Sequence, residues 1–269
     1  MSEQAQRLAN NDRASWQAYW SAQGMPWRAE PEIDEERQRF LAGRRQIESD
    51  FEHANHPFEG IKLDRADIEW LLTTHESRGM RGPVDASDEK QSEREGLNLA
   101  GVDLQKSKLD GLPLARATFN EAHLEQTNLS NAQLEEADFQ NAHLEAAVLI
   151  DANLKGAALA DAHLVAATLW RACLNDANFE FAHMEGVDLS EANLQGTNFT
   201  NADLEAANLS EAHLQGSVMH GACLAGAYLF GAHMEGADLS RVTKGAARGS
   251  FPGAYALDVN LEDDGAHLE

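Results

Sequence analysis

Large apolar residues recur at a strict interval of five through the middle of the chain. From Leu99 to Leu239, every fifth residue is Leu, Phe or Met. A small residue usually stands two positions before each of these centres, as in Ala152-Asn153-Leu154. An amphipathic helix repeats its apolar face about every 3.6 residues and a strand every second residue, so neither element explains the spacing. The pattern predicts short five-residue units with two side chains inside and three outside.

Two polar or Gly residues follow most centres, as Ser190-Glu191 and Gln215-Gly216 do, and they indicate a turn after each unit. Repeated units of this kind are typical of a solenoid, in which neighbouring coils stack and bury a continuous core. We expect the centres to form that core. They include Leu99, Leu104, Phe119, Leu124, Phe139, Leu154, Phe179, Leu194, Phe199, Leu214 and Leu239.

A slower period of 20 residues sets the number of units in one coil. Phe occupies the centre only at Phe119, Phe139, Phe179 and Phe199. His residues stand immediately before other centres at the same interval. They form a polar column of His123, His143, His163 and His183. The period predicts four-sided coils with like residues stacked about 4.8 Å apart, and about seven coils make a rod roughly 35 Å long.

The repeated Ala-Asp/Asn-Leu with two variable residues resembles the consensus of the pentapeptide-repeat family over residues 97–242. The resemblance implies an all-β solenoid, a right-handed quadrilateral β-helix. Residues 1–96 lie outside the match, and we expect them to form an N-terminal α-helical extension. Residues 243–269 lose the register and form an irregular Gly-rich tail. The last residues of that tail look like one more pentapeptide out of register, which leaves open whether the chain is a fragment of a longer protein.

The N-terminal 96 residues have a different pattern. Helical spacing predicts helices over 5–23 and over 31–51. The stretch over 58–72 fits both an early repeat fragment and a helix, and we favour the helix. Residues 85–95 have almost no apolar content and indicate a short solvated helix or a linker. We interpret the module as a cap on the solenoid end, with partner recruitment as a compatible alternative.

The chain is strongly acidic, with 45 acidic and 21 basic residues and a formal net charge of −24. Residues 97–242 alone hold 20 acidic and 6 basic residues. Nucleic acids and anionic membranes are both bound through basic residues, so we expect direct contact with neither. The chain has no leader pattern and no apolar run of membrane-spanning length, which favours a cytoplasmic protein. Cys173 and Cys223 fall on opposite sides of the coil and are not expected to form a disulfide.

The His column is the first candidate for chemistry, because a parallel column of Glu follows two residues on. Its members are Glu125, Glu145, Glu185 and Glu205. Acid–base catalysis and metal binding both need groups that converge on one point, whereas a column on a flat wall holds its side chains parallel. We therefore expect no catalytic residue, no cofactor and no metal site, with an incidental transition-metal site as a less favoured interpretation. The expected protein is not an enzyme.

Apolar residues at outward positions mark a candidate interaction surface on one side of the coil. They are Val148, Ile150, Trp170, Tyr228 and Phe230, with Val165 and Phe181 on neighbouring sides. Such residues indicate contact with something. The candidates are the chain's own N-terminal helices or tail, a partner protein, or a second copy in a homodimer.

The sequence thus favours a non-enzymatic protein-interaction scaffold whose partner it does not identify. The family resemblance implies an alternative, because some members mimic duplex DNA at type II topoisomerases such as DNA gyrase and inhibit the enzyme or protect it from inhibitors. The rod has about one net charge per 2.5 Å, against about one per 1.7 Å in DNA. It also lacks the inserted loops and the C-terminal helix expected of that group, so mimicry is the second choice.

Overall fold

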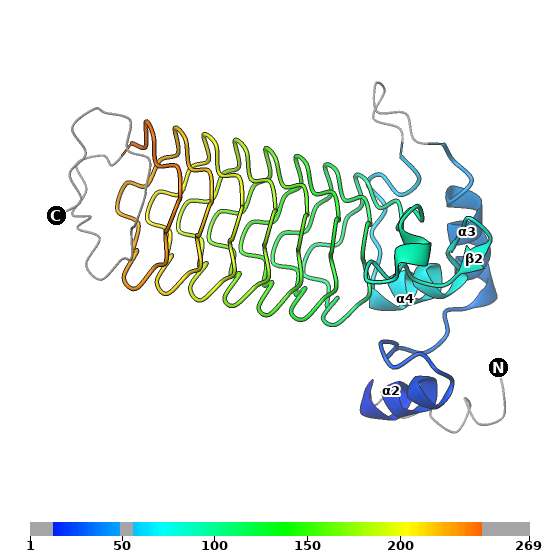
Figure 1. Ribbon diagram of the computed structural model, residues 1–269. Coiled ribbons are helices and arrows are strands. Elements are labelled where there is room, and N and C mark those ends of the chain that lie inside the picture. The colour runs from blue at the N-terminus through cyan, green and yellow to red at the C-terminus, as the bar shows by residue number, and fades with distance from the viewer. Residues whose placement is uncertain (1–12, 49–55, 244–269) are drawn as a thin grey trace.

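The computed structural model describes residues 13–48 and 56–243. A small helical module lies at one end of a long stack of coils, and the described part of the chain ends at the other end of the stack (Figure 1). Nearly all of the predicted tail lies outside the described residues. The same holds for the first part of the predicted helix over 5–23 and the last part of that over 31–51.

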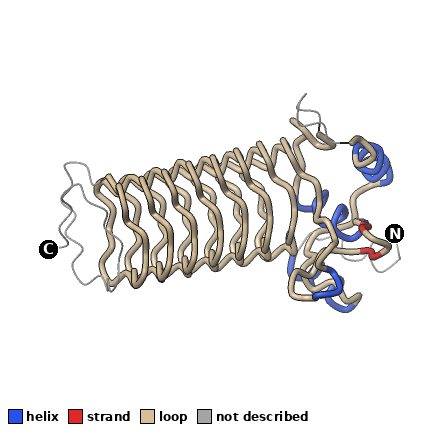
Figure 2. The backbone as a smooth tube through the Cα atoms, turned by 45° about the horizontal axis from the view of Figure 1, so that its top comes forward, coloured by secondary structure: helices blue, strands red, loops and turns tan. Residues whose placement is uncertain are grey.

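The stack is a repeat solenoid whose coils contain 20 residues each. Parallel bridges join residues one coil apart without interruption, from Asn98 with Thr118 to Cys223 with Thr243. A centre donates its N–H forward to the next coil, as Leu124 N does to His143 O over 2.7 Å. Seen from another side, the coils remain evenly stacked along one axis (Figure 2). The observed interval is the one that the Phe and His spacing predicts.

The sides of the coil are single-residue bridges rather than strands of several residues. Two residues of every five form the turn, and the second residue after a centre has a positive φ, 57° at Glu136 and 66° at Gly216. Only a short part of each unit is therefore available for pairing. Within the part of the chain that the structure describes, strands of two residues occur only outside the solenoid. They are β1 (Glu76–Ser77) and β2 (Met80–Arg81), which pair antiparallel.

The interior of the solenoid is a narrow column of apolar side chains. The centres expected in the core are fully buried, apart from Leu239, which is 4% exposed. The rings of Phe119 and Phe139 stack with centroids 4.8 Å apart and planes 6° from parallel. Phe179 and Phe199 stack in the same way at 5.2 Å and 9°. Like residues therefore lie directly above one another in adjacent coils.

Three helices form most of the N-terminal module. Helix α2 (Arg13–Ala22) and helix α3 (Glu35–Arg44) lie inside the two stretches with predicted helical spacing, and α4 (Arg65–Thr74) follows. A single 3₁₀ turn, η1 (Glu89–Gln91), lies in the polar stretch before the solenoid. Local sequence starts the helices, since Asp34 accepts a hydrogen bond from Arg37 N at the beginning of α3.

The segment just before α4 belongs to the coil stack. Leu63 N donates to Asp103 O over 3.0 Å, and Asp103 N donates to Ile61 O over 3.1 Å. Lys62 forms a parallel bridge with Asp103. This segment therefore lies along the open backbone edge of the first coil. Both interpretations of the stretch over 58–72 hold in part, the repeat fragment up to Leu63 and the helix in α4.

A buried carboxylate joins the helical module to the solenoid. Glu69 of α4 accepts hydrogen bonds from Ala29 N and Glu30 N, both over 2.9 Å, and pairs with Arg65 over 2.7 Å. Arg65 in turn donates to Asp110 O of the first coil over 2.9 Å. Burial raises the pKa of the Glu69 carboxyl, an effect that the two N–H donors and Arg65 oppose. This set of contacts fixes α4 against the coil.

Candidate functional site

The candidate interaction surface lies on one wall of the solenoid, called here the aromatic wall. Successive bridges connect Val148 through three polar residues to Tyr228. Ile150, Trp170 and Phe230 each stand two positions further along their own coil, in the adjoining column. The structure therefore places the five residues in two adjacent columns of the coil stack.

The aromatic wall has two separate apolar groups rather than one continuous patch. Tyr228 and Phe230 are 65% and 60% exposed, close to the end of the described solenoid. The second group, Val148, Ile150 and Trp170, is only partly exposed. Between the two groups, both columns hold polar residues, namely Asp188, Ser190, Asn208 and Ser210. The exposed aromatic pair is thus the stronger candidate for contact.

The partial burial of Trp170 has a local cause. The guanidinium carbon of Arg171 lies 5.0 Å from the centroid of the Trp170 ring. Arg171 is held there by Asp151, with a nitrogen–oxygen distance of 3.0 Å. A cation over an aromatic face stabilises the ring without a partner protein. Trp170 therefore supports a partner-binding surface less strongly than Tyr228 and Phe230 do.

The described N-terminal helices do not cover Tyr228 and Phe230, the exposed pair of the aromatic wall. They lie at the first coil, where Arg13 of α2 pairs with Asp110 over 2.8 Å (Figure 2). Asp110 stands in the same column as Ile150, two coils earlier, so α2 lies on the side of the aromatic wall but at its first coil. The interpretation that the helices dock on the outward apolar residues is therefore wrong for Tyr228 and Phe230, which remain largely exposed. The interpretation that the tail does so concerns residues outside the described part of the chain.

Other exposed apolar side chains are scattered. Phe181 is 49% exposed at a coil corner, and Val165 is 39% exposed on the wall of the His column. Two further residues escape the sequence pattern, Val218 at 37% and Phe40 of α3 at 40%. Val218 stands at an outward position where Asn and Asp also occur, so its place in the five-residue unit is the only feature of the sequence that could have identified it as exposed. None of these joins the aromatic wall.

The four predicted His residues stack as a column on a different wall. The successive ring centroids of His123, His143, His163 and His183 lie 5.0, 4.9 and 4.8 Å apart. The planes of neighbouring rings deviate from parallel by 7° to 17°. A second stacked pair, His213 and His233 at 5.1 Å, was not singled out from the sequence although it has the same 20-residue spacing.

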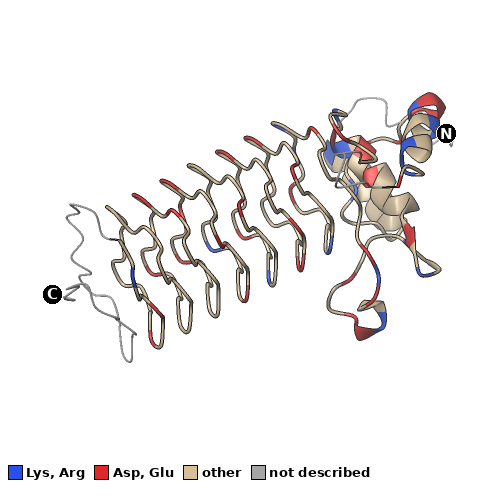
Figure 3. Cartoon of the chain, turned by 90° about the horizontal axis from the view of Figure 1, so that it is seen from above, with Lys and Arg blue, Asp and Glu red and all other residues tan. Residues whose placement is uncertain are grey.

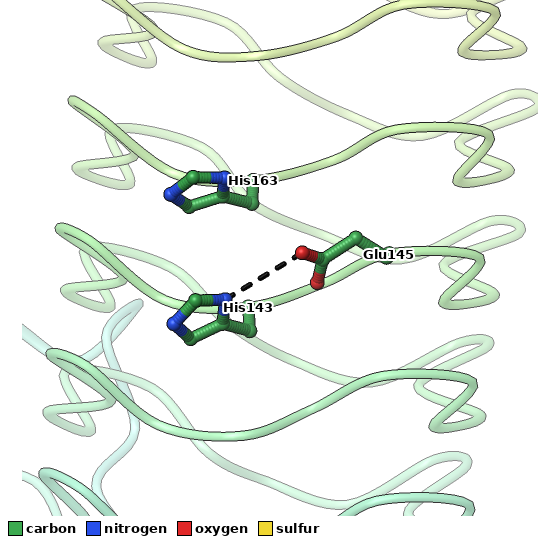
Figure 4. A group of neighbouring side chains, drawn as sticks. All are labelled: His143, Glu145 and His163. Atoms are coloured by element: carbon green, nitrogen blue, oxygen red, sulfur yellow. Dashed lines mark ion pairs between the residues drawn. The ribbon is translucent and has the colours of Figure 1, made fainter.

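Carboxylates lie beside this column. His123 Nδ1 is 3.3 Å from Glu125 Oε1, and His143 Nδ1 is 3.5 Å from Glu145 Oε1 (Figure 4). The second oxygens of Glu125, Glu145 and Glu185 are buried without a hydrogen-bond partner among the described residues. The wall is therefore not a set of strictly parallel side chains, because Glu125 and Glu145 turn back toward the rings.

Acidic side chains are distributed along the coils, with few basic ones between them (Figure 3). One of the basic residues, Arg116, is paired with Glu136 over 2.8 Å. Cys173 and Cys223 are free thiols. The described helices include none that is long and apolar enough to cross a bilayer.

A cleft of about 720 Å³ lies where the module meets the first coil. Its walls include Arg37, Asp64, Asp67 and Lys106. Arg37 pairs with Asp67 over 2.7 Å, and this hydrogen bond raises the pKa of the guanidinium. Arg37, Asp64 and Asp67 of the cleft are thus engaged with one another in holding the module together.

These features define a class of protein, a repeat solenoid with open walls and a helical module on its first coil. The family profile for pentapeptide repeats matches eight copies over residues 98–132, 127–164, 172–210 and 207–243. The chain belongs to the pentapeptide-repeat family.

Several solved structures are similar to the chain. HetL, from the cyanobacterium Nostoc sp. strain PCC 7120 and involved in heterocyst differentiation regulation, is 24% identical, with 62% of this chain and 87% of HetL covered and a TM-score of 0.27. Full-length QnrB1, a plasmid-mediated fluoroquinolone resistance protein, is 18% identical, with 63% and 93% covered and a TM-score of 0.28. Rfr23 from the cyanobacterium Cyanothece 51142 is 22% identical, with 63% and 90% covered and a TM-score of 0.15. No curated protein matches the chain.

Proposed function

We propose that this protein is a non-enzymatic scaffold that binds another protein through the aromatic wall. The observation that carries the proposal is the exposure of Tyr228 and Phe230, at 65% and 60%, on adjacent columns of a rigid coil. Aromatic residues are enriched among those that dominate binding energy at protein interfaces. Burial of each ring by a partner contributes about 1.5–3 kcal/mol.

The surroundings of the pair suit a protein interface. Polar residues of the same two columns, including Asn208 and Ser210, lie one coil away and supply hydrogen-bonding groups for a rim. The backbone beneath is fixed by hydrogen bonds between coils, such as Glu211 N to Phe230 O over 2.8 Å. A rigid wall loses little conformational freedom when it binds, which favours affinity.

The test is affinity capture from source-cell lysate with the wild type and a Tyr228→Asp/Phe230→Asp double variant. Phe181→Asp is the matched control, because it removes an exposed aromatic ring at a corner away from the aromatic wall. We expect a protein that the wild type and the control retain and the double variant loses. Retention of the same proteins by all three refutes the proposal.

The partner can also be a second copy of the chain, in an isologous pair formed through the aromatic wall. Light scattering of the purified wild type and the same double variant distinguishes this case. A mass that falls to the monomer only in the double variant supports a homodimer. An unchanged monomer mass in both assigns the wall to a different protein.

The remaining finer features belong to the same proposal. The rod is taken as the right-handed quadrilateral β-helix implied by the family, in a cytoplasmic protein, with residues 1–96 as the cap of its first coil. The contacts of Ile61 and Leu63 with Asp103 support the cap, since they cover backbone groups that a bare coil end exposes. We assign residues 97–242 to the pentapeptide-repeat solenoid and residues 243–269 to the C-terminal tail.

DNA mimicry at gyrase is the alternative function, and the charge of the rod favours it. Residues 97–242 hold 20 acidic and 6 basic residues, and the acidic ones are spread along the coils (Figure 3). A gyrase supercoiling assay with purified protein is the test. Inhibition of supercoiling, or protection from a quinolone, at micromolar protein supports mimicry, and the absence of both refutes it.

A further inference from the structure

We propose that His143, Glu145 and His163 bind one divalent transition-metal ion of the kind that prefers imidazole ligands, such as Zn²⁺. Among the described residues, these three form the group whose nitrogen and carboxylate ligand atoms all lie within 4.8 Å of one another. Two imidazoles and one carboxylate are a donor set that suits Zn²⁺, Ni²⁺ and Cu²⁺. The site is distinct from the aromatic wall and does not depend on the proposed scaffold function.

The coil geometry brings the three side chains together. His143 and His163 are joined by a parallel bridge, so their rings stand one above the other with centroids 4.9 Å apart. Glu145 follows His143 by two residues and turns back, which places Oε1 3.5 Å from His143 Nδ1. Figure 4 shows the carboxylate beside the two rings, with one nitrogen of each ring on the side that faces it.

A small movement converts this arrangement into a coordination site. Zn–N bonds of about 2.0–2.1 Å place two nitrogen ligands of a tetrahedral ion about 3.4 Å apart. The present separation is at most 4.8 Å, so each ring has to move by about 0.7 Å and tilt out of the parallel stack. The side chains of His143 and Glu145 are each 37% exposed, so an ion can reach them from solvent.

The carboxylate has a second oxygen, Oε2, that is buried without a hydrogen-bond partner among the described residues, a feature that Glu145 shares with Glu125 and Glu185 of the same wall. A buried carboxylate oxygen without a partner is costly, and a bound cation removes that cost. The carboxylate also supplies negative charge against a dication, which two neutral imidazoles alone do not.

The chain contains matched sites that lack the carboxylate. His163 and His183 stack at 4.8 Å with Val165 in place of the Glu, and His213 and His233 stack at 5.1 Å with Gln215 there. These pairs have the same imidazole geometry as the proposed site. They separate the contribution of a complete three-ligand site from that of stacked His alone.

The experiment is titration of untagged full-length protein with Co²⁺ by visible absorption and with Zn²⁺ by calorimetry. We expect about one tight site in the wild type, because the neighbouring set of His123 and Glu125 would share His143 with it and Gln105 already donates to Glu125 Oε1 over 3.2 Å.

Glu145→Gln and His163→Asn each weaken Zn²⁺ binding by about tenfold or more, the range in which even outer-shell partners act. His213→Asn is the control and leaves the affinity unchanged. Gln215→Glu supplies the missing carboxylate beside His213 and His233 and should let the protein bind a second equivalent of Co²⁺.

Circular dichroism melts establish that the variants remain folded, as expected for changes on an outer wall. A tight site that is lost in His163→Asn and kept in His213→Asn supports the proposal. A wild type that binds no Zn²⁺ at about a hundred micromolar, or a His163→Asn variant that binds as tightly as the wild type, overturns it. Equal losses in His163→Asn and His213→Asn also overturn it, because they indicate nonspecific binding by stacked His.

Discussion

The stacked Phe column offers a quantitative test of how the solenoid is held together. Phe139 is fully buried, and its ring lies 4.8 Å from that of Phe119. Its coil is bonded to the next one by hydrogen bonds such as Phe139 N to Ala158 O over 2.7 Å. Because these hydrogen bonds fix the backbone, it cannot move inward to fill the cavity that a smaller side chain would leave. We therefore expect Phe139→Ala to lower the free energy of unfolding by about 4–5 kcal/mol, the upper part of the range for buried Phe.

Phe139→Leu is the matched control for cavity formation. The next residue in the column is Leu159, which is itself fully buried, so the column accommodates Leu. We expect Phe139→Leu to cost only about 1–2 kcal/mol, through lost area and lost ring stacking. Urea unfolding followed by far-UV circular dichroism measures both variants.

A double-mutant cycle then isolates the ring contact. Leu substitutions at Phe119 and Phe139 should show a coupling of about 0.5–1.5 kcal/mol, the value of an aromatic pair. The same cycle on Phe139 and Phe179, which Leu159 separates, should show a coupling within about 0.5 kcal/mol of zero. A cost below about 2 kcal/mol for Phe139→Ala, or equal coupling in the two cycles, would refute the reasoning.

Three further predictions concern the N-terminal module. Gly96→Ala should destabilise the junction by about 1–3 kcal/mol, because a Cβ there would overlap the backbone of Arg116; tryptophan fluorescence during urea unfolding measures the loss. Glu69→Gln should cost about 3–5 kcal/mol in the same assay, because it removes the nearest carboxylate from the buried Arg65 guanidinium and leaves it only Asp110 at 3.5 Å. Burial lowers the pKa of His75, so the unfolded chain binds the proton first as the pH falls below about 6.5. The melting temperature of the module should therefore fall on acidification below that pH.

Each of these has a control. Gly43→Ala, in α3, introduces a Cβ with nothing within 4 Å and should be neutral or slightly stabilising. Glu36→Gln removes a carboxylate in the first turn of the same helix and should cost well under about 1 kcal/mol. His75→Gln should remove the pH-dependent part of the melting temperature. A melting curve of this variant that falls as steeply as that of the wild type assigns the effect to other groups.

The sequence by itself determined the solenoid. Each unit meets nearly the same environment in every coil, so the interval of five and the slower interval of 20 specify the coil, its turns and its core. The stacked columns of Phe and His follow from the same counting. Helix-start residues such as Asp34 act within a few positions, which is why the sequence also located the helices.

The tertiary structure alone decided how the outer walls and the module are arranged. The spacing placed Tyr228 and Trp170 on one wall. Only the structure showed that Arg171 lies over the Trp170 ring, whereas no described residue covers the Tyr228 ring. It also showed that Glu145 turns back toward the His column and that Glu69 holds a segment about 40 residues away. Periodicity fixes which side of the coil a residue occupies, whereas side-chain direction and contacts between distant segments depend on the complete fold.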